Sequence, residues 1–228
     1  MPDAKLLTVA ERLEHVQERI ASAMRRAGRT DEVTLVAVTK LVDVDRIAEA
    51  YRAGVRHFGE NRVQEFEDKR RLLTLPSAVW HMVGHLQSNK AKRAAELFQT
   101  IDSVDSESVA AKLSIAASGP GRRLPVLVQV NVGGEGTKSG VDPDELNRFI
   151  ETLSRLDALE VRGLMTIPPF LEPAERVRPY FARLRELGEK LGLRELSMGM
   201  SHDFEIAIQE GATQVRIGTA LFGERPRK

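Results

Sequence analysis

The stretch "EVTLVAVTK", residues 32–40, decides how the rest of the chain is interpreted. Apolar residues fill position 33 and positions 35–38, and three of them are valine. A run of this length and β-branched content predicts a buried β-strand. The run leads directly into Thr39 and Lys40. Lysine is usually a solvated surface residue, but a lysine at the end of a buried strand can also be an amine that the strand positions for chemistry. Both interpretations stay open at this point.

The size and composition of the chain limit the class of protein. The 228 residues are 42% hydrophobic, which is enough for a sizeable core. A net charge of +1 and an aromatic content of 5% argue against a nucleic-acid-binding surface. The absence of cysteine excludes disulfides, thiolate metal sites and cysteine nucleophiles. The N-terminus lacks a signal-peptide core, and no apolar run approaches the roughly 20 residues that span a bilayer. We therefore expect a soluble, cytoplasmic protein with no nucleic-acid, membrane or metal partner.

The first thirty residues predict a helix that lies outside the main fold. Thr8 and Glu11 have the spacing of an N-terminal capping box. Apolar residues at 9, 13, 16, 20 and 24 share one helical face, and Gly28 provides a C-terminal stop. Since this helix precedes every predicted strand, we expect residues 1–30 to pack on the outside of a single domain that spans residues 1–228.

From residue 33 onward, predicted strands alternate with predicted helices. The strands are predicted at 33–38, 55–59, 79–84, 98–104, 124–132, 160–167, 195–200 and 213–218, with helical patterns between them, for example at 43–54, 105–117 and 178–192. Alternation of this kind predicts an α/β protein with a parallel sheet. Eight repeats favour a closed (β/α)8, TIM-like barrel over an open doubly wound sheet. No glycine-rich nucleotide-binding motif follows a strand, which removes the main support for the open alternatives.

Polar residues cluster where the predicted strands end, and that end of a (β/α)8 barrel carries the chemistry. The residues at these ends are Lys40, Glu60, Asn61, His81, Asn131, Met165, Thr166, Ser201, Arg216, Gly218 and Thr219. The glycine-rich segment 132–143 also follows a strand. It is either a flexible connection or a mobile flap over a site.

The ends of the last two strands predict an anion site. "SMGMSHD" (197–203) and "VRIGTALFG" (215–223) each place a hydroxyl, Ser201 or Thr219, where a helix begins. Two helix N-termini side by side favour an anion such as phosphate. The alternative is that Ser201 only caps its helix.

Arg216 alternates with apolar neighbours, so its side chain is expected to point into the barrel. A guanidinium there needs an acceptor, and a buried carboxylate partner is the alternative to a functional role. A lysine that faces a phosphate site suits a Schiff base with a phosphorylated aldehyde or ketone, because desolvation and nearby positive charge lower the pKa of its amine. Lys40 is the candidate for that amine.

Six motifs resemble one known family. They are "VAVTK", "FGENRVQE", "WHMVGHLQSNK", "GLMTI", "LSMGMSHDFEIAI" and "VRIGTALFG", and together they cover nearly the whole chain. They resemble the pyridoxal phosphate homeostasis proteins, the YggS/PROSC family. The resemblance implies the fold of the N-terminal domain of alanine racemase, with pyridoxal 5′-phosphate (PLP) held as a Schiff base on Lys40.

The same resemblance implies roles for the other candidate residues. It implies that Ser201, Gly218 and Thr219 hold the phosphate group and that Arg216 faces the pyridine nitrogen. It also implies that Asn61, His81 and Met165 line the ring pocket. Many members of the family carry a second lysine two residues after the first, whereas this chain has Val42 there. A role of that second lysine in relaying cofactor is therefore in doubt for this chain.

A carrier of PLP and a PLP-dependent racemase are both compatible with these residues. A carboxylate would keep the ring nitrogen protonated, but an arginine, with its own pKa above about 12, cannot accept that proton. Arg216 is therefore expected to leave the nitrogen unprotonated and the ring a weak electron sink. Racemisation needs a base on each face, and the two tyrosines, Tyr51 and Tyr180, both fall in predicted helices. The chain also ends just after the eighth strand, and we expect no second domain over the site.

We therefore expect a monomeric, non-catalytic PLP carrier, with PLP and apo forms of PLP-dependent enzymes as its partners. An amino-acid racemase is the alternative. A class I aldolase would share the barrel, the lysine and the phosphate site, and only the cofactor separates it from the carrier.

Overall fold

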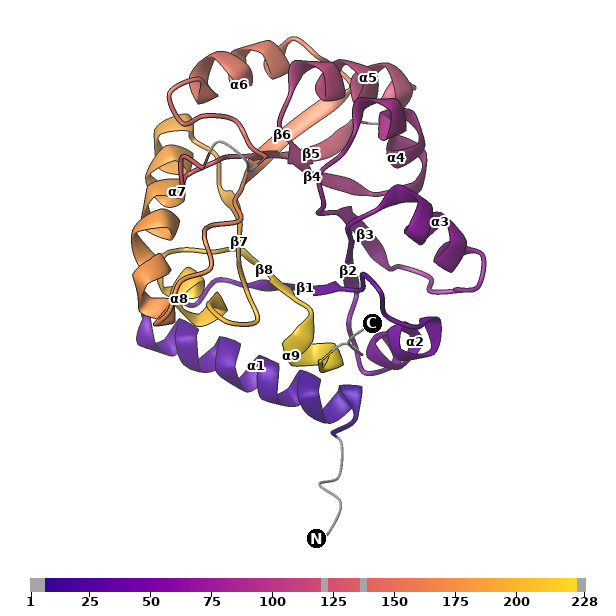
Figure 1. Cartoon of the computed structure of the whole chain (residues 1–228), viewed down its shortest axis with the longest axis vertical. Coiled ribbons are helices and arrows are strands. Elements are labelled where there is room, and N and C mark those ends of the chain that lie inside the picture. Colours follow the sequence, from indigo (N-terminus) through magenta and orange to yellow (C-terminus); the bar gives the residue numbers. More distant parts are fainter. Residues whose placement is uncertain (1–6, 120–122, 136–138, 225–228) are drawn as a thin grey trace, which may run out of the picture.

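Eight parallel strands form a closed barrel in the order of the sequence, with helices around it (Figure 1). This arrangement is seen in a computed structural model that describes residues 7–119, 123–135 and 139–224. The strands are β1 (Thr34–Val38), β2 (His57–Glu60), β3 (Val79–Met82), β4 (Thr100–Val104), β5 (Leu124–Gln129), β6 (Leu159–Met165), β7 (Glu195–Met200) and β8 (Gln214–Ile217). The predicted (β/α)8 barrel is confirmed.

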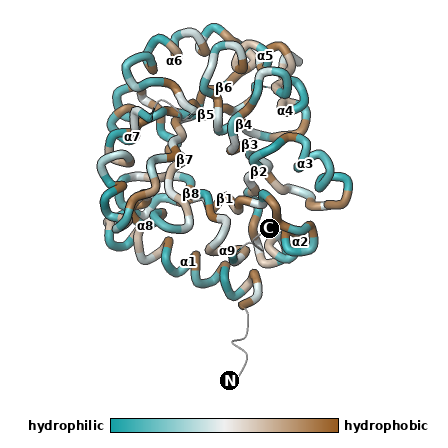
Figure 2. The backbone as a smooth tube through the Cα atoms, in the orientation of Figure 1, coloured by the Kyte–Doolittle hydropathy of each residue, from teal (hydrophilic) through white to brown (hydrophobic). Residues whose placement is uncertain are grey.

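The helices lie outside the strands and alternate with them along the chain. They are α1 (Val9–Arg26), α2 (Val44–Arg52), α3 (Val63–Arg70), α4 (Ala91–Leu97), α5 (Glu107–Ala117), α6 (Leu146–Ser154), α7 (Arg178–Leu191), α8 (Phe204–Gln209) and α9 (Thr219–Phe222), with 3-10 turns η1 (Ser88–Lys90) and η2 (Ala174–Val177). Figure 2 shows hydrophobic and hydrophilic positions alternating along the helices, as expected for helices that cover a core on one side only.

The predicted N-terminal helix, α1, is present and packs on the outside of the barrel. The Thr8 side chain accepts a hydrogen bond from the backbone of Glu11, and the Glu11 carboxylate accepts one from the backbone of Thr8. The helix buries one apolar face against α2, α8 and α9. It ends at Arg26, and Gly28 follows with a φ of +65°. That left-handed conformation carries no penalty at glycine, which explains the stop that the sequence indicates.

The barrel closes through the pairing of β1 with β8. Val36 lies opposite Arg216, and Ala37 lies opposite Ile217. Because these strands are parallel, the segment that follows β1 lies beside the segment that follows β8. Residues that are about 180 positions apart in the chain thus meet at one end of the barrel, and this pairing prepares the candidate site.

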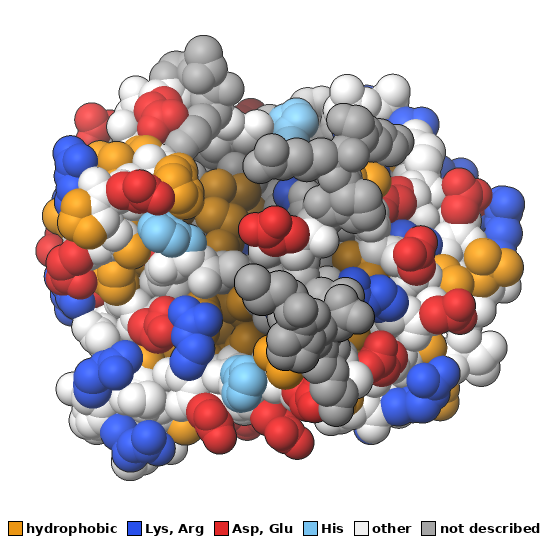
Figure 3. All heavy atoms as spheres, turned by 60° about the horizontal axis from the view of Figure 1, so that its bottom comes forward, with side chains coloured by type: hydrophobic (Ala, Val, Ile, Leu, Met, Phe, Trp, Pro, Cys, Tyr) orange, Lys and Arg blue, Asp and Glu red, His pale blue; other side chains and the backbone are white. Residues whose placement is uncertain are grey.

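The surface carries charges of both signs. On the face shown in Figure 3, acidic and basic side chains are interspersed around a hollow with hydrophobic side chains in its depth. Within the described residues, no helix is both long and apolar enough to cross a membrane.

Gly163 marks the closest approach between β6 and β7. A Cβ atom added at Gly163 would lie 1.9 Å from the carbonyl oxygen of Glu195. The opposing atom is backbone, so neither strand can relieve the contact without losing its pairing. The register of β6 against β5 also shifts next to this position, between the pairs made by Val126 and Leu127.

We predict that Gly163→Ala lowers the free energy of unfolding by about 3 kcal/mol, at the upper end of the usual cost of overpacking. Urea denaturation monitored by circular dichroism would measure the change. Gly119→Ala is the matched control, because the nearest atom to a Cβ there, outside its chain neighbours, lies 4.0 Å away. Equal stability of the two variants would show that β6 and β7 are farther apart than described.

Candidate functional site

Lys40 lies two residues beyond the end of β1 and is half-buried. The peptides on both sides of it are fixed by side chains. Lys69 Nζ donates a hydrogen bond of 2.6 Å to the carbonyl oxygen of Thr39. The backbone N–H of Leu41 donates one of 2.5 Å to Glu65 Oε1. Leu41 has a φ of +58°, which is unfavourable for a non-glycine residue, so the bond to Glu65 helps to hold a strained turn at this place.

Lys69 is the hub that joins these contacts. Its Nζ also lies 2.8 Å from Glu60 Oε1 and 2.7 Å from Glu65 Oε1. Glu60 has no exposed surface, and the Thr39 hydroxyl donates to its Oε1 over 2.7 Å. Burial raises the pKa of Glu60, while the charge and hydrogen bonds of Lys69 and the hydroxyl of Thr39 oppose the rise. The ammonium of Lys69 therefore both neutralises a buried carboxylate and anchors the segment that carries Lys40.

Arg216 of β8 lies inside the barrel, as predicted, with 3% of its surface exposed. Its Nη1 donates to Ser197 Oγ over 2.9 Å, and its Nη2 donates to the carbonyl oxygen of Thr166 over 2.7 Å. These acceptors are a hydroxyl and a carbonyl, rather than the carboxylate partner that was the alternative. Burial lowers the pKa of Arg216 to about 10, against the opposing charges of Asp102 and Asp203. The guanidinium is still protonated at neutral pH.

The loops after β7 and β8 are tied together. The backbone N–H of Ala220 donates to Ser201 Oγ over 3.1 Å. Ser201 therefore caps α9, which follows the next strand, and the residue that precedes α8 is Asp203. The predicted alternative, that Ser201 caps its own helix, is not what the structure shows. Since Ser201 Oγ accepts this bond, its hydroxyl hydrogen is still available to donate to an anion.

Gly218 and Thr219 lie at the start of α9. The carbonyl oxygen of Gly218 accepts from the backbone N–H groups of Leu221 and Phe222, and Thr219 is exposed. The structure thus brings Ser201, Gly218 and Thr219 into one corner, next to the segment that follows β1.

Met165 and Asn61 lie at the same end of the barrel. Met165 is the last residue of β6 and is fully buried. Asn61 follows β2 and lines a pocket of about 470 Å³ between the loops after β2 and β3, together with Arg62, Gly84 and Lys90. A Cβ added at Gly84 would lie 2.3 Å from the Asn61 carbonyl oxygen, so glycine is required there for the two loops to pack.

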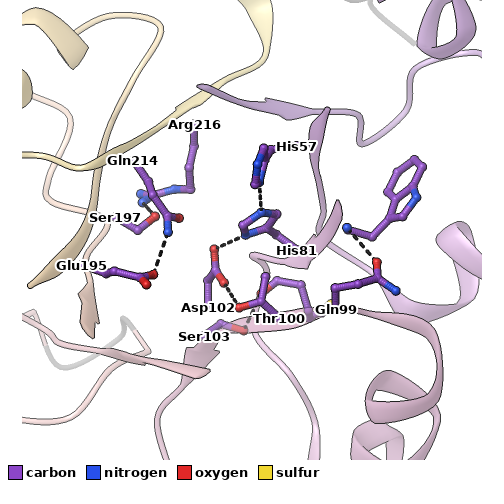
Figure 4. A network of polar contacts seen from close by, with 12 residues as sticks. His57, His81, Gln99, Thr100, Asp102, Ser103, Glu195, Ser197, Gln214 and Arg216 are labelled. Carbon is purple, nitrogen blue, oxygen red and sulfur yellow. Dashed lines mark hydrogen bonds and ion pairs between the residues drawn. The ribbon is translucent and has the colours of Figure 1, made fainter. Parts of the chain in front are cut away.

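His81 belongs to a different group of residues (Figure 4). Its Nε2 lies 3.0 Å from Nδ1 of His57, the first residue of β2, and its Nδ1 lies 2.9 Å from Asp102 Oδ2. His81 also lines a pocket with residues that begin strands rather than end them. Contact of His81 with a cofactor ring stays a prediction, and both of its ring nitrogens already have partners inside the barrel.

Backbone hydrogen bonds hold the glycine-rich segment 132–143 against the end of β5. The N–H of Val141 donates to the carbonyl oxygen of Gln129, and the N–H of Asn131 donates to that of Val141. Residues 136–138 lie outside the described residues, so the choice between a connection and a flap stays open for the middle of the segment.

Lys69 and Glu65 belong to this site but were not predicted from the sequence. The spacing of four between them, on a helix directly after the "FGEN" motif, was a usable signal because such pairs face each other. The contact of Lys69 with Thr39 spans 30 residues and had no signal in the sequence.

Known proteins resemble this chain over almost its whole length. A family model described as "Alanine racemase, N-terminal domain" matches residues 12–226. The chain is 47% identical over 226 residues to the pyridoxal phosphate homeostasis protein of Aquifex aeolicus, and the match covers 96% of this chain and 99% of that protein. The chain belongs to the family of pyridoxal phosphate homeostasis proteins. The resemblance seen in the six motifs is confirmed.

Solved structures support the same assignment. PipY of Synechococcus elongatus PCC7942, in a structure with PLP bound, is 42% identical to this chain, with a TM-score of 0.84. The match covers 95% of this chain and 100% of PipY. An alanine racemase of Clostridium difficile 630 is 17% identical, with a TM-score of 0.67, and this chain covers 58% of it. That distant likeness shows the fold alone.

The Lys69 hub generates a prediction about stability. Lys69→Met removes the cation and leaves the carboxylate of Glu60 buried, which we expect to lower the free energy of unfolding at neutral pH by about 3 kcal/mol. The pKa of Glu60 then rises further, because burial is no longer opposed by an ammonium. The native state holds a proton that the unfolded state releases. Stability of the variant is therefore greatest in acid and falls as the pH rises past 4.5, the ordinary value for this carboxyl.

Urea denaturation at several pH values between 4 and 8 measures this effect. Arg71→Met is the control, since Arg71 is 71% exposed and its two carboxylate contacts, at 3.6 and 3.9 Å, lie on the surface. We expect a loss below about 1 kcal/mol there, with no added pH dependence. Equal, small losses in both variants would mean that Lys69 does not stabilise Glu60.

Proposed function

We propose that this chain binds PLP on Lys40 and acts in PLP homeostasis, as a carrier rather than a catalyst. The observation that carries the proposal is the β1–β8 pairing. It sets Lys40 beside the corner formed by Ser201, Gly218 and Thr219, with the protonated Arg216 one layer deeper in the barrel. The relatives named for PLP homeostasis and the PLP-bound structure of PipY support the identity of the ligand.

The residues present fit the chemistry of this ligand. PLP carries an aldehyde, a phosphate and a pyridine nitrogen. Lys40 Nζ would attack the aldehyde carbon and form a Schiff base with loss of one water molecule. The free hydroxyl hydrogen of Ser201 and the hydroxyl of Thr219 would donate to the phosphate group, at the start of α9. Asn61 and Met165 would lie beside the ring.

Arg216 would set the electronic state of the cofactor. When bound, PLP supplies an electron sink, which is strongest when its ring nitrogen is protonated. Arg216 is itself a cation at neutral pH, and its pKa of about 10 is well above that of a pyridine nitrogen. It would donate a hydrogen bond to that nitrogen and leave it without a proton. The sink would be weak, which suits storage better than catalysis.

Neither tyrosine supports the racemase alternative. The hydroxyl of Tyr51 donates to the carbonyl oxygen of Pro76, which precedes β3 and so lies at the end of the barrel opposite Lys40. Tyr180 of α7 packs against the hydrophobic core. A second base on the other face of the ring is required for racemisation. We therefore assign no catalytic residue and no metal, and we propose a monomeric, cytoplasmic protein that exchanges PLP with apo forms of PLP-dependent enzymes.

Lys40→Ala tests the attachment of the cofactor. We expect the wild-type chain incubated with PLP and reduced with borohydride to carry the added mass on the peptide that contains Lys40. The variant should lose that labelled peptide and the associated visible absorption, because an alanine has no amine. Lys92→Ala, on the exposed surface of α4, should behave as the wild type. Label on other lysines only, in the wild type, would contradict the proposal.

Assays of function distinguish the three hypotheses, a PLP carrier, an amino-acid racemase and a class I aldolase. A racemase would turn over free amino acids, and an aldolase would cleave sugar phosphates. A carrier would do neither, yet would restore the activity of an apo PLP-dependent enzyme after mixing. Amino-acid turnover that depends on Lys40 would move the racemase alternative to the front.

Arg216→Gln tests the environment of the ring nitrogen. Loss of the cation should shift the absorption spectrum of bound PLP and weaken its binding, whereas Arg216→Lys keeps the positive charge and should change the spectrum less. Circular dichroism and thermal unfolding would check that both variants fold, since the side chain also bonds to Ser197 and Thr166. An unchanged spectrum and affinity in Arg216→Gln would place this side chain away from the ring.

A further inference from the structure

The segment that carries Lys40 forms a tight turn with an unusual residue in it. The backbone N–H of Val42 donates to the carbonyl oxygen of Thr39 over 3.0 Å, so Lys40 and Leu41 are the two central residues of a β-turn. Leu41 has a φ of +58°. A positive φ at the second central position is a feature of type II turns, where glycine is the usual residue. A leucine in that conformation carries a steric cost.

The side chain of Leu41 does not offset this cost by packing, because it is 68% exposed. A hydrogen bond to Glu65 favours the turn instead, since the backbone N–H of Leu41 donates to Glu65 Oε1 over 2.5 Å. With the negative φ that leucine prefers, the peptide between Lys40 and Leu41 would turn over and its N–H would point away from Glu65. Glu65 therefore selects one of two conformations of the turn.

Glu65 is itself held in place by Lys69. The Nζ of Lys69 donates to Glu65 Oε1 over 2.7 Å and to Glu60 Oε1 over 2.8 Å. Its third acceptor is the carbonyl oxygen of Thr39, at 2.6 Å, so all three N–H groups of the ammonium have partners. Burial opposes the ionisation of Glu65, but the hydrogen bonds from Lys69 and from the backbone of Leu41 keep its pKa below the ordinary value. The turn thus meets an ionised acceptor whose position is already fixed.

The conformation of the turn affects the side chain of Lys40. Turning over the peptide between Lys40 and Leu41 changes the ψ of Lys40, and the rotamers open to a side chain depend on its own φ and ψ. Lys40 is half-buried, so neighbouring atoms restrict these rotamers further. The two conformations of the turn would therefore present the amine of Lys40 in different ways.

We propose that Glu65 is a positioning residue for Lys40. By accepting a hydrogen bond from the backbone N–H of Leu41, it keeps the turn in the conformation that directs the amine of Lys40 to the corner formed by the loops after β7 and β8. The importance of this direction rests on the proposed binding of PLP to Lys40. The effect of Glu65 on the amine can nevertheless be measured without the cofactor.

Trace acetylation of the cofactor-free chain tests this effect. Acetic anhydride modifies each lysine at a rate set by the pKa and the accessibility of its amine, and peptide mass analysis gives the rate of Lys40 relative to Lys92, an exposed residue of α4. We expect Glu65→Ala to change that ratio at least about threefold, because releasing a left-handed leucine shifts the turn population by more than this factor. Glu67→Ala is the matched control on the same helix. Glu67 accepts from Arg93 over 2.6 Å rather than from the turn, so the ratio should stay unchanged.

Leu41→Gly, added to Glu65→Ala, separates the turn from any other effect of losing this carboxylate. Glycine adopts a positive φ without the steric cost, so the turn can persist without its acceptor. We expect the double variant to return the acetylation ratio of Lys40 at least halfway to the wild-type value. Urea denaturation would check that both variants fold.

Titration of the same variants with PLP connects the turn to the proposed function. Glu65→Ala should weaken binding about tenfold, within the range expected for the cost of a left-handed residue, and Leu41→Gly should recover most of that loss. If the acetylation ratio responds to Glu65→Ala but the wild type does not attach PLP to Lys40, the PLP proposal fails and the positioning role stands.

Two results would overturn the positioning role. One is an acetylation ratio that is the same in the wild type and in Glu65→Ala, which would mean that Lys40 does not depend on the contact. The other is a change of the ratio that Leu41→Gly does not reverse, which would mean that Glu65 acts on Lys40 by a route other than the turn.

Discussion

The pairing of β1 with β8 is the constraint on which the rest of the structure depends. It closes the sheet, so no strand has a free edge, and it is made between segments about 180 residues apart. The same pairing sets Lys40 beside Gly218 and Thr219. A chain that failed to close would lose its fold and its candidate site together. The site is therefore a consequence of barrel closure rather than a feature added to a finished fold.

The buried charges of Glu60 and Arg216 are tolerated because neighbouring strands and helices supply hydrogen-bonding partners for them. Glu60 points away from the barrel axis, toward Lys69 on α3, and Arg216 points inward, toward Ser197 and a backbone carbonyl. An isolated charge in such surroundings would be strongly unfavourable, and a paired one contributes little net stability. The contribution of these charges is to hold neighbouring groups in place. Lys69 fixes the peptide next to Lys40, and Arg216 keeps a cation inside the barrel, where we propose that the ring nitrogen of PLP lies.

The sequence predicted most of the fold because each strand ends in a local signal. Alternating apolar runs and helix stops such as Gly28 give the eight βα units, and strand alternation gives the inward direction of Arg216. The depth of a side chain inside the barrel has no such signal. His81 faces inward as alternation requires, but only its partner His57, at the start of β2, reveals that it belongs with the opposite end. The clamp of Lys69 on Thr39 is likewise a contact between distant segments.

The two ends of this barrel carry different polar groups, although the side chains of the strands alternate inward and outward in the same way at both. At the end where the strands finish, loops and short helices supply donors, so an anion is favoured. At the end where they begin, charges of both signs line the pocket that contains His81, among them Glu195 and Arg162. Polar residues at the starting end of a barrel usually serve stability. Gln214 Oε1 is an exception, because no described residue donates to it and an unpaired buried amide oxygen costs desolvation free energy.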